Sequence, residues 1–272
     1  MNNCFTCAKS TYCLRCWMGY DNPNDFRCND YETNIKPMTI DCNNFDETYG
    51  LLFLQRYKDV RIFHRGSVTY GTAHEGSDTD YGIIVPDNAI IIDVEGVFDN
   101  EKSDTRIHPC SSSKKRIDLE IIKEHDFLYL LDEHNPIAIE AIMLDHLKGF
   151  ESFKIDPWKL RCKFGQIANN SWSKAKKKMT VKKDLDFYCG VKSLFHSIRL
   201  QMFAAYMSKG FITTSERSFA SVLFNEIIHD WTVNNFTWED FKEKYKPVYN
   251  YWHSRMVECC PKPEEEFKNN KK

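Results

Sequence analysis

Two carboxylates in the first half of the chain have a spacing that suits metal chemistry. Asp78 and Asp80 are separated by one residue and lead into the apolar run GIIV. Residues i and i+2 of an extended segment face the same way, so both carboxylates can bind the same hard divalent cations, such as Mg²⁺ or Mn²⁺. Two like charges this close are costly unless a metal neutralises them or one is protonated. An Asp-x-Asp alone is usually a solvated turn or strand end, so the neighbouring residues decide whether it is a metal site.

That context is a Gly-Ser pair that precedes the carboxylates. Gly66 and Ser67 follow a predicted strand at 60–64, and ten residues separate Ser67 from Asp78. Glycine permits close backbone approach, and exposed N–H groups together with the Ser67 hydroxyl can hold phosphate oxygens. A phosphate cradle beside a two-carboxylate metal site is the layout of two-metal phosphoryl or nucleotidyl transfer.

The sequence of this segment, RGSVTYGTAHEGSDTDYGIIVP, resembles that of a known family. It is similar to the signature of the DNA polymerase β nucleotidyltransferase superfamily, above all to its minimal nucleotidyltransferases and to those predicted in bacterial RNA-repair operons. There a Gly-Ser-x-x-Tyr-Gly turn precedes Ser-Asp-x-Asp-Tyr. The resemblance continues through IDLEIIKEHDFLYLLDEHNPIAIEAI, with its Asn-Pro-x-x-x-Glu segment, and through KSLFHSIRL at 192–200. It covers roughly residues 46–210.

The resemblance implies a third carboxylate on a neighbouring strand, and we assign it to Asp118 in RIDLEII. Glu120 shares a strand face with Asp118 and is the substitute; an edge strand with one polar face is the other interpretation. In the implied reaction Asp78 and Asp80 bind both metals, and Asp118 binds the one that activates the acceptor hydroxyl. That hydroxyl attacks the α-phosphorus of an NTP such as ATP, and pyrophosphate leaves.

A helix predicted over residues 185–207 carries a basic row. Lys192, His196 and Arg199 recur at i, i+4 and i+7, beside an apolar stripe on the same helix. Such a row can face a cleft, or it can be a solvated flank. The resemblance places a lysine on this helix, and phosphate favours charge-assisted donors. We therefore expect Lys192 and Ser193 to contact the β- and γ-phosphates, with His196 and Arg199 as further nucleotide-binding candidates.

The charges indicate a polyanionic partner. Residues 157–183 contain nine Lys or Arg and no acid, whereas residues 75–104 contain nine acids and one Lys. Trp158 and Trp172 lie in the basic segment, and an aromatic ring beside cations suits base stacking plus phosphate attraction. A solvated Lys-rich loop is the alternative. We predict transfer to an RNA 3′ end, such as a tRNA or a cleaved RNA; a protein AMP-transferase or a non-catalytic nucleotide- or RNA-binding scaffold are the alternatives.

Cysteines form a second pattern near the N-terminus. Cys4-x-x-Cys7 and Cys13-x-x-Cys16 can each wrap a tetrahedral ion, and four thiolates satisfy a closed structural Zn²⁺ site. The spacer between the pairs is short for an ordinary zinc ribbon, so one pair can instead combine with a His or with another cysteine, either Cys28 or Cys42. Reduced thiols in an unstructured terminus are the alternative. The odd total of 11 cysteines and the absence of an N-terminal apolar run favour a reducing, cytoplasmic compartment.

The composition fits a folded chain of the α/β (α+β) class. With 272 residues, 42% of them hydrophobic, and only 11 Gly and 9 Pro, the chain is neither disordered nor fibrous. A net charge of −2 argues against bulk coating of nucleic acid or membrane, and every apolar run is shorter than the roughly 20 residues of a membrane helix.

We predict three parts. Residues 1–45 form a cysteine-rich module, residues 46–150 a small mixed-sheet nucleotidyltransferase core, and residues 151–272 a helical domain with a charged tail. Within the core we expect strands at 60–64, 81–85, 90–94 and 116–122 and helices at 49–57, 126–134 and 136–144. Thr237-Trp-Glu-Asp240 reads as a capping box that opens another helix.

Overall fold

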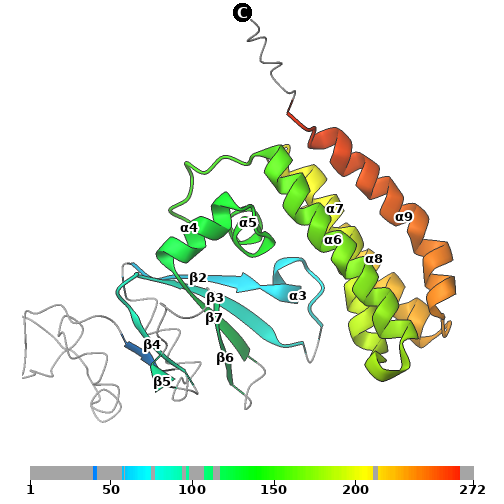
Figure 1. Ribbon diagram of the computed structural model, residues 1–272, viewed down its shortest axis with the longest axis horizontal. Coiled ribbons are helices and arrows are strands. Elements are labelled where there is room, and N and C mark those ends of the chain that lie inside the picture. Colours follow the sequence, from blue (N-terminus) through cyan, green and yellow to red (C-terminus); the bar gives the residue numbers. More distant parts are fainter. Residues whose placement is uncertain are drawn as a thin grey trace, which may run out of the picture. The chain divides into compact units, whose positions relative to one another are not determined.

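The computed structural model describes residues 39–41, 57, 59–74, 77–93, 96–97, 107–112, 117–210 and 214–263. Residues 49–56 of the predicted helix at 49–57 and the zinc candidates Cys4, Cys7, Cys13 and Cys16 lie outside these residues, and the zinc site stays a prediction. The chain divides into two compact units. One combines Met1–Ile62 with Gly82–Asp126, and the other combines Phe63–Tyr81 with Phe127–Lys272 (Figure 1).

The strands form two sheets. The strands of the first are β1 (Thr39–Asp41), β4 (Ile90–Asp93) and β5 (Gly96–Val97); β1 runs parallel to β4, and β5 runs antiparallel to it. The second has the order β2-β3-β7-β6, with bounds β2 Arg61–Arg65, β3 Thr79–Val85, β7 Ile117–Lys123 and β6 Ile107–Ser112. Four consecutive residues at the end of β3 are buried, as expected of a strand covered on both faces.

The helices make up most of the second unit. Their bounds are α3 Gly66–Thr69, α4 Glu124–Asp132, α5 Pro136–Met143, α6 Pro157–Thr180, the 3₁₀ turn η3 Lys182–Asp184, α7 Phe187–Met207, α8 Thr214–Thr232 and α9 Trp238–Cys259. Helix α7 packs against α6, α8 and α9 (Figure 1). Almost every residue of α7 after Gly190 is buried, which is typical of a helix enclosed on all sides. The predicted α+β class is confirmed.

Side-chain caps set where these helices begin. The predicted capping box is confirmed: Thr237 Oγ1 accepts from Asp240 N, and Asp240 Oδ2 accepts from Thr237 N at 2.8 Å. Asp156 caps α6, with Pro157 at the first helical position. Helix α7 begins two residues later than predicted, because Asp186 has non-helical backbone and its side chain accepts from Cys189 N as the N-cap.

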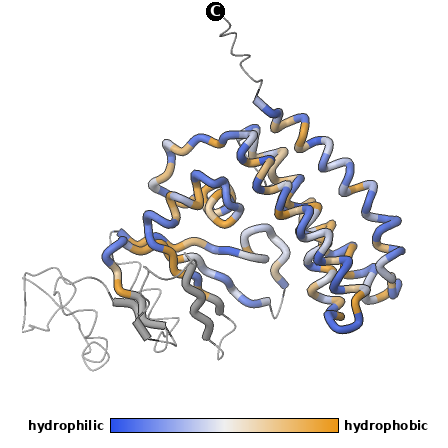
Figure 2. The backbone as a smooth tube through the Cα atoms, viewed as in Figure 1, coloured by the Kyte–Doolittle hydropathy of each residue, from blue (hydrophilic) through white to orange (hydrophobic). Residues whose placement is uncertain are grey.

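The lysines at 174–178, which could have formed a Lys-rich loop, belong instead to the last turns of α6. Figure 2 shows the hydrophilic stretch where α6 passes into η3. Among the helices of the described residues, none is long and apolar enough to cross a bilayer.

A buried carboxylate joins α8 to α9. Asp230 is 2% exposed and accepts from Lys244 Nζ at 2.7 Å, from Tyr245 Oη at 2.6 Å and from Asn234 Nδ2 at 2.9 Å. Lys244 also pairs with Glu226 at 2.8 Å, but the Glu226 side chain is half exposed. A buried carboxylate that satisfies three donors contributes far more than an exposed ion pair.

We therefore expect Asp230→Ala to lower the free energy of unfolding by about 3 kcal/mol, because it leaves Tyr245 and Lys244 without their shared acceptor. The matched control, Glu226→Ala, removes the exposed partner of the same lysine and should cost less than about 1 kcal/mol. Urea denaturation of the two variants measures the difference. Equal losses would show that burial of Asp230 adds nothing.

Candidate active site

The Gly-Ser turn lies against the second carboxylate. Gly66 opens α3 directly after β2, with φ +62° in the left-handed region. A Cβ on Gly66 would collide with Oδ2 of Asp80 and lie 3.1 Å from its Cγ. Only glycine therefore satisfies both the backbone angle and the close approach. The turn closes through Thr72 N, which donates to Ser67 O at 2.8 Å.

The predicted carboxylates differ in their surroundings. Asp78 is exposed just before β3, and Asp80 is the second residue of β3 and half-buried. Asp118 lies on β7 opposite Ser111 of β6, but its side chain is not among those described. Within the described side chains, no group of three His, Cys, Asp or Glu could hold a metal. The structure thus brings Gly66 and Asp80 together, and the full trio stays a prediction.

A buried arginine organises the surroundings of this turn. Arg199 of α7 is 3% exposed, and its Nη1 donates to Glu140 Oε1 of α5 at 2.6 Å. Its guanidinium carbon lies 3.9 Å from the ring centroid of Tyr70, the residue that caps α3. A buried charge needs a partner of opposite charge, and a guanidinium also stacks well on an aromatic face. Arg199 therefore ties α5 and the end of the Gly-Ser turn to α7.

The residues predicted to bind the nucleotide from α7 differ in exposure and in their partners. Lys192 is exposed, with its Nζ 5.3 Å from the ring centroid of Tyr188. Ser193 is buried, and its hydroxyl donates to Cys189 O at 2.7 Å. His196 is half-buried, and Arg199 is bound to Glu140. Of the four residues predicted to bind the nucleotide from this helix, Lys192 is the one with an exposed charge.

Two polar rings beside the turn are neutral at physiological pH. Burial, assisted by the charge of Arg199, lowers the pKa of His196 well below its usual value. Its Nδ1 accepts from Arg199 Nε at 3.3 Å, which assigns the proton to Nε2. Burial raises the pKa of Tyr70 to about 12. The rings of Tyr70 and His196 meet edge to face at 5.6 Å. Because both rings are neutral, the Tyr70 hydroxyl and the His196 Nε2–H are neutral donors beside the turn.

Three residues of this region escaped the sequence prediction: Tyr70, Glu140 and Asp145. Asp145 Oδ2 accepts from His64 N at 2.9 Å, at the end of β2. Tyr70 and Glu140 belong to the Gly-Ser-x-x-Tyr and Asn-Pro-x-x-x-Glu segments that carry the family resemblance. Their partner, Arg199, lies far along the chain, and a local pattern does not reveal such a pairing.

Comparison with known proteins adds little. No protein-family model matches the chain, and no curated protein matches its sequence. One solved structure that is similar is the crystal structure of a nucleotidyltransferase-like protein from Exiguobacterium sibiricum 255-15. The two chains are 9% identical, the match covers 75% of this chain and 68% of that one, and the TM-score is 0.26. With a TM-score this low, any assignment rests on the site itself.

The buried ion pair predicts a characteristic mutant cycle. Arg199→Met leaves Glu140 buried without a counter-charge and should lower the free energy of unfolding by about 3–5 kcal/mol. Adding Glu140→Met should recover much of that loss, because two apolar residues of similar volume no longer bury a charge. Urea denaturation of the single and double variants measures the coupling. Additive losses in the double variant would mean that the two side chains act independently.

The neutral state of His196 predicts a pH dependence of stability. The unfolded chain takes up a proton on His196 near its usual pKa of about 6.5, whereas the folded chain takes it up only at lower pH. The contribution of neutral His196 to the free energy of unfolding is therefore complete above about pH 6.5. It falls at lower pH, by up to about 1.4 kcal/mol per pH unit. His196→Gln should reduce the difference in unfolding free energy between about pH 7.5 and 5.5. An unchanged difference would contradict this assignment.

Proposed function

We propose that this protein is a metal-dependent nucleotidyltransferase that moves a nucleoside monophosphate from an NTP to a hydroxyl at an RNA 3′ end. The observation that carries the proposal is the close approach of Gly66 to the Asp80 carboxylate. The approach places the Gly66 backbone, at the start of the Gly-Ser turn, next to an acidic side chain. Phosphate binding and metal binding at one point are what nucleotidyl transfer needs.

The donor set fits a hard divalent cation. Asp78 and Asp80 offer carboxylate oxygens, the ligands that Mg²⁺ and Mn²⁺ prefer, and no sulfur or imidazole ligand is required. A bound cation would neutralise charge on the transferred phosphate. Asp78, which is exposed, and Asp80, which is fixed against Gly66, are the residues that would hold it. Asp118 remains the proposed third carboxylate, with Glu120 as its substitute.

The chain's own residues have distinct proposed roles in the transfer. The Gly66–Ser67 turn and Lys192 bind the β- and γ-phosphates, and Tyr70 with His196 supplies neutral donors beside them. The acceptor oxygen forms a bond to the α-phosphorus, the bond from that phosphorus to pyrophosphate breaks, and the hydroxyl proton passes to Asp118. Arg199 positions Tyr70 and does not itself contact phosphate, because Glu140 holds its guanidinium.

An RNA acceptor is favoured over a protein acceptor by the charge of α6. Five lysines on α6 and η3 have no acidic partner among the described residues: Lys174, Lys176, Lys178, Lys182 and Lys183. Positive charge of this density attracts phosphates. Incubation with each α-labelled NTP, Mg²⁺ or Mn²⁺ and pooled RNA tests the proposal. Label on the protein alone would support AMP transfer to a side chain, and nucleotide binding without any labelled product would support a non-catalytic scaffold.

The carboxylates should be essential for transfer. Asp78→Asn and Asp80→Asn each remove a charged oxygen ligand and should lower the transfer rate by about a hundredfold or more. The fold should persist or become slightly more stable, because crowding of like charges is relieved. Asp87→Asn is a matched control on an exposed carboxylate that pairs with His125, and it should keep full activity. Full activity in both test variants would overturn the proposed function.

The glycine at the turn should be needed for geometry. Gly66→Ala places a methyl group on the Asp80 carboxylate and should lower the transfer rate about a hundredfold by displacing that side chain. Gly210→Ala is the matched control, because Gly210 also has a positive φ of +92° but no atom within 4 Å of the added Cβ. Gly210→Ala shows what a methyl group at a positive φ costs away from the turn, so a further loss of transfer rate in Gly66→Ala reports the change at Asp80. Similar rates would contradict the proposed geometry.

A further inference from the structure

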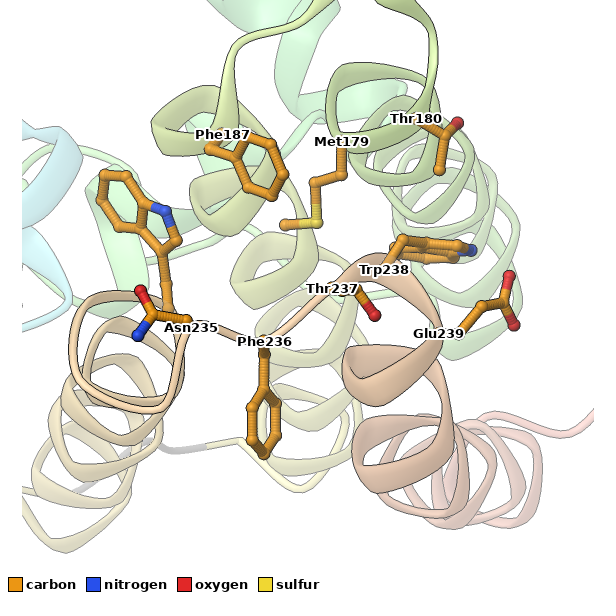
Figure 3. Close-up of a pocket in the computed structure, with 9 residues that line it drawn as sticks. Met179, Thr180, Phe187, Asn235, Phe236, Thr237, Trp238 and Glu239 are labelled. Carbon is orange, nitrogen blue, oxygen red and sulfur yellow. The ribbon is translucent and has the colours of Figure 1, made fainter.

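A cavity lies at the ends of four helices, within the unit that contains α6 to α9. Its volume is about 550 Å³, in the range of ligand pockets (Figure 3). The residues that line it are Met179, Thr180, Phe187, Trp231, Asn235, Phe236, Thr237, Trp238 and Glu239. It shares no residue with the Gly66–Asp80 site, and we call it the aromatic pocket.

The lining offers flat apolar surface. Figure 3 shows Phe187 and Met179 pointing toward one another on one side of the aromatic pocket. Phe187 and Trp231 are half-buried, so part of each ring remains available to a ligand. Trp238 is 4% exposed and is held in place by an edge contact with Trp172 at 5.5 Å. Rings and a thioether around one cavity suit a planar aromatic guest.

The walls are fixed before any ligand arrives. Phe236 N donates to Asp230 O at 3.0 Å, and Asp230 is the buried carboxylate that joins α8 to α9. The Thr237–Asp240 capping box fixes the first turn of α9. Asn235 has a positive φ of +54°, and its Nδ2 donates to Val233 O at 3.3 Å, which leaves Oδ1 as an acceptor. A preformed cavity lowers the cost of ordering protein side chains when a ligand binds.

Three lysines lie on the elements that border the aromatic pocket: Lys176, Lys182 and Lys183. Lys176 lies one helical turn before Thr180, so it is on the face of α6 that carries this lining residue. Lys182 and Lys183 follow in η3, and neither has an acidic partner among the described residues. The acidic lining residue, Glu239, is paired with Lys242 at 3.0 Å. The occupant should therefore combine an aromatic ring with negative charge.

We propose that the aromatic pocket binds one unstacked base of a single-stranded RNA, while the flanking phosphates lie on Lys176, Lys182 and Lys183. Single-stranded RNA is bound in this way by proteins that stack bases on aromatic side chains and hold the backbone with cations. The inference deepens the proposed function, because it assigns part of the acceptor RNA to a named site. Trp172, a stacking candidate from the sequence, instead packs against Trp238, Tyr249 and Lys246.

An abasic oligonucleotide separates base binding from phosphate binding. We expect the wild-type protein to bind a single-stranded RNA about tenfold more tightly than the same strand with abasic nucleotides, as measured by fluorescence anisotropy. Trp231→Leu should bind both strands as weakly as the wild type binds the abasic one. Tyr251→Leu is the matched control, because Tyr251 is an exposed aromatic residue on α9 outside the aromatic pocket, and it should behave as the wild type.

Neutralising two of the lysines beside the aromatic pocket gives a second readout. Lys176→Gln with Lys183→Gln should lower the slope of log affinity against log salt by about 0.7 per lysine, with the preference for intact RNA over abasic RNA retained. If Trp231→Leu does not fold, 4-thiouridine crosslinking of the wild-type protein provides the same test. Crosslinks should map to residues 179–187 or 231–239. Crosslinks confined to other segments would overturn the inference.

The outcomes separate this inference from the proposed function. Nucleotide transfer by the wild type, without any preference for intact RNA over abasic RNA, would overturn the inference and leave the transferase proposal standing. The expected preference for intact RNA, without any nucleotide transfer, would support the inference and overturn the transferase proposal. Binding of an apolar peptide to the aromatic pocket in place of RNA, at unchanged affinity in the lysine variant, would also overturn the inference.

Discussion

The candidate active site depends on one buried ion pair, between Arg199 and Glu140. A guanidinium that is removed from water needs a carboxylate, so α7 and α5 must meet at this point. The same guanidinium stacks on Tyr70, which ends the turn that begins at Gly66. The packing of the helices is thereby transmitted to the residue that lies against Asp80. The acidic site is positioned by a buried charge that does not take part in the reaction.

The protein uses the same principle at the aromatic pocket. Asp230 of α8 is buried and accepts from Lys244 and Tyr245 of α9, and the neighbouring Phe236 donates its N–H to the Asp230 carbonyl. In both places a buried carboxylate joins two helices, and the residues that could meet a ligand lie beside it. Such support is needed because ligand-binding groups work only when their own positions are already determined.

Local patterns in the sequence were sufficient for much of the fold. Apolar runs predicted β2, β3, β7 and α5, and Thr237 with Asp240 predicted the start of α9. The spacing between Gly66 and Asp80 was also readable, because a turn and the next strand are close in sequence. The role of Arg199 could not be predicted from local patterns, since its partner Glu140 is 59 residues away. The aromatic pocket was missed for the same reason: four helices contribute to its lining.

The most direct test of the central claim is the fate of the phosphates in one reaction. Wild-type protein is incubated with RNA and an NTP that carries label at either the α- or the γ-phosphate, and the RNA product is then counted. Nucleotidyl transfer breaks the bond between the α- and β-phosphates, so we predict that α-label enters the RNA and that γ-label leaves with pyrophosphate. Transfer of γ-label to the RNA, or no labelled RNA with any NTP, would contradict the account.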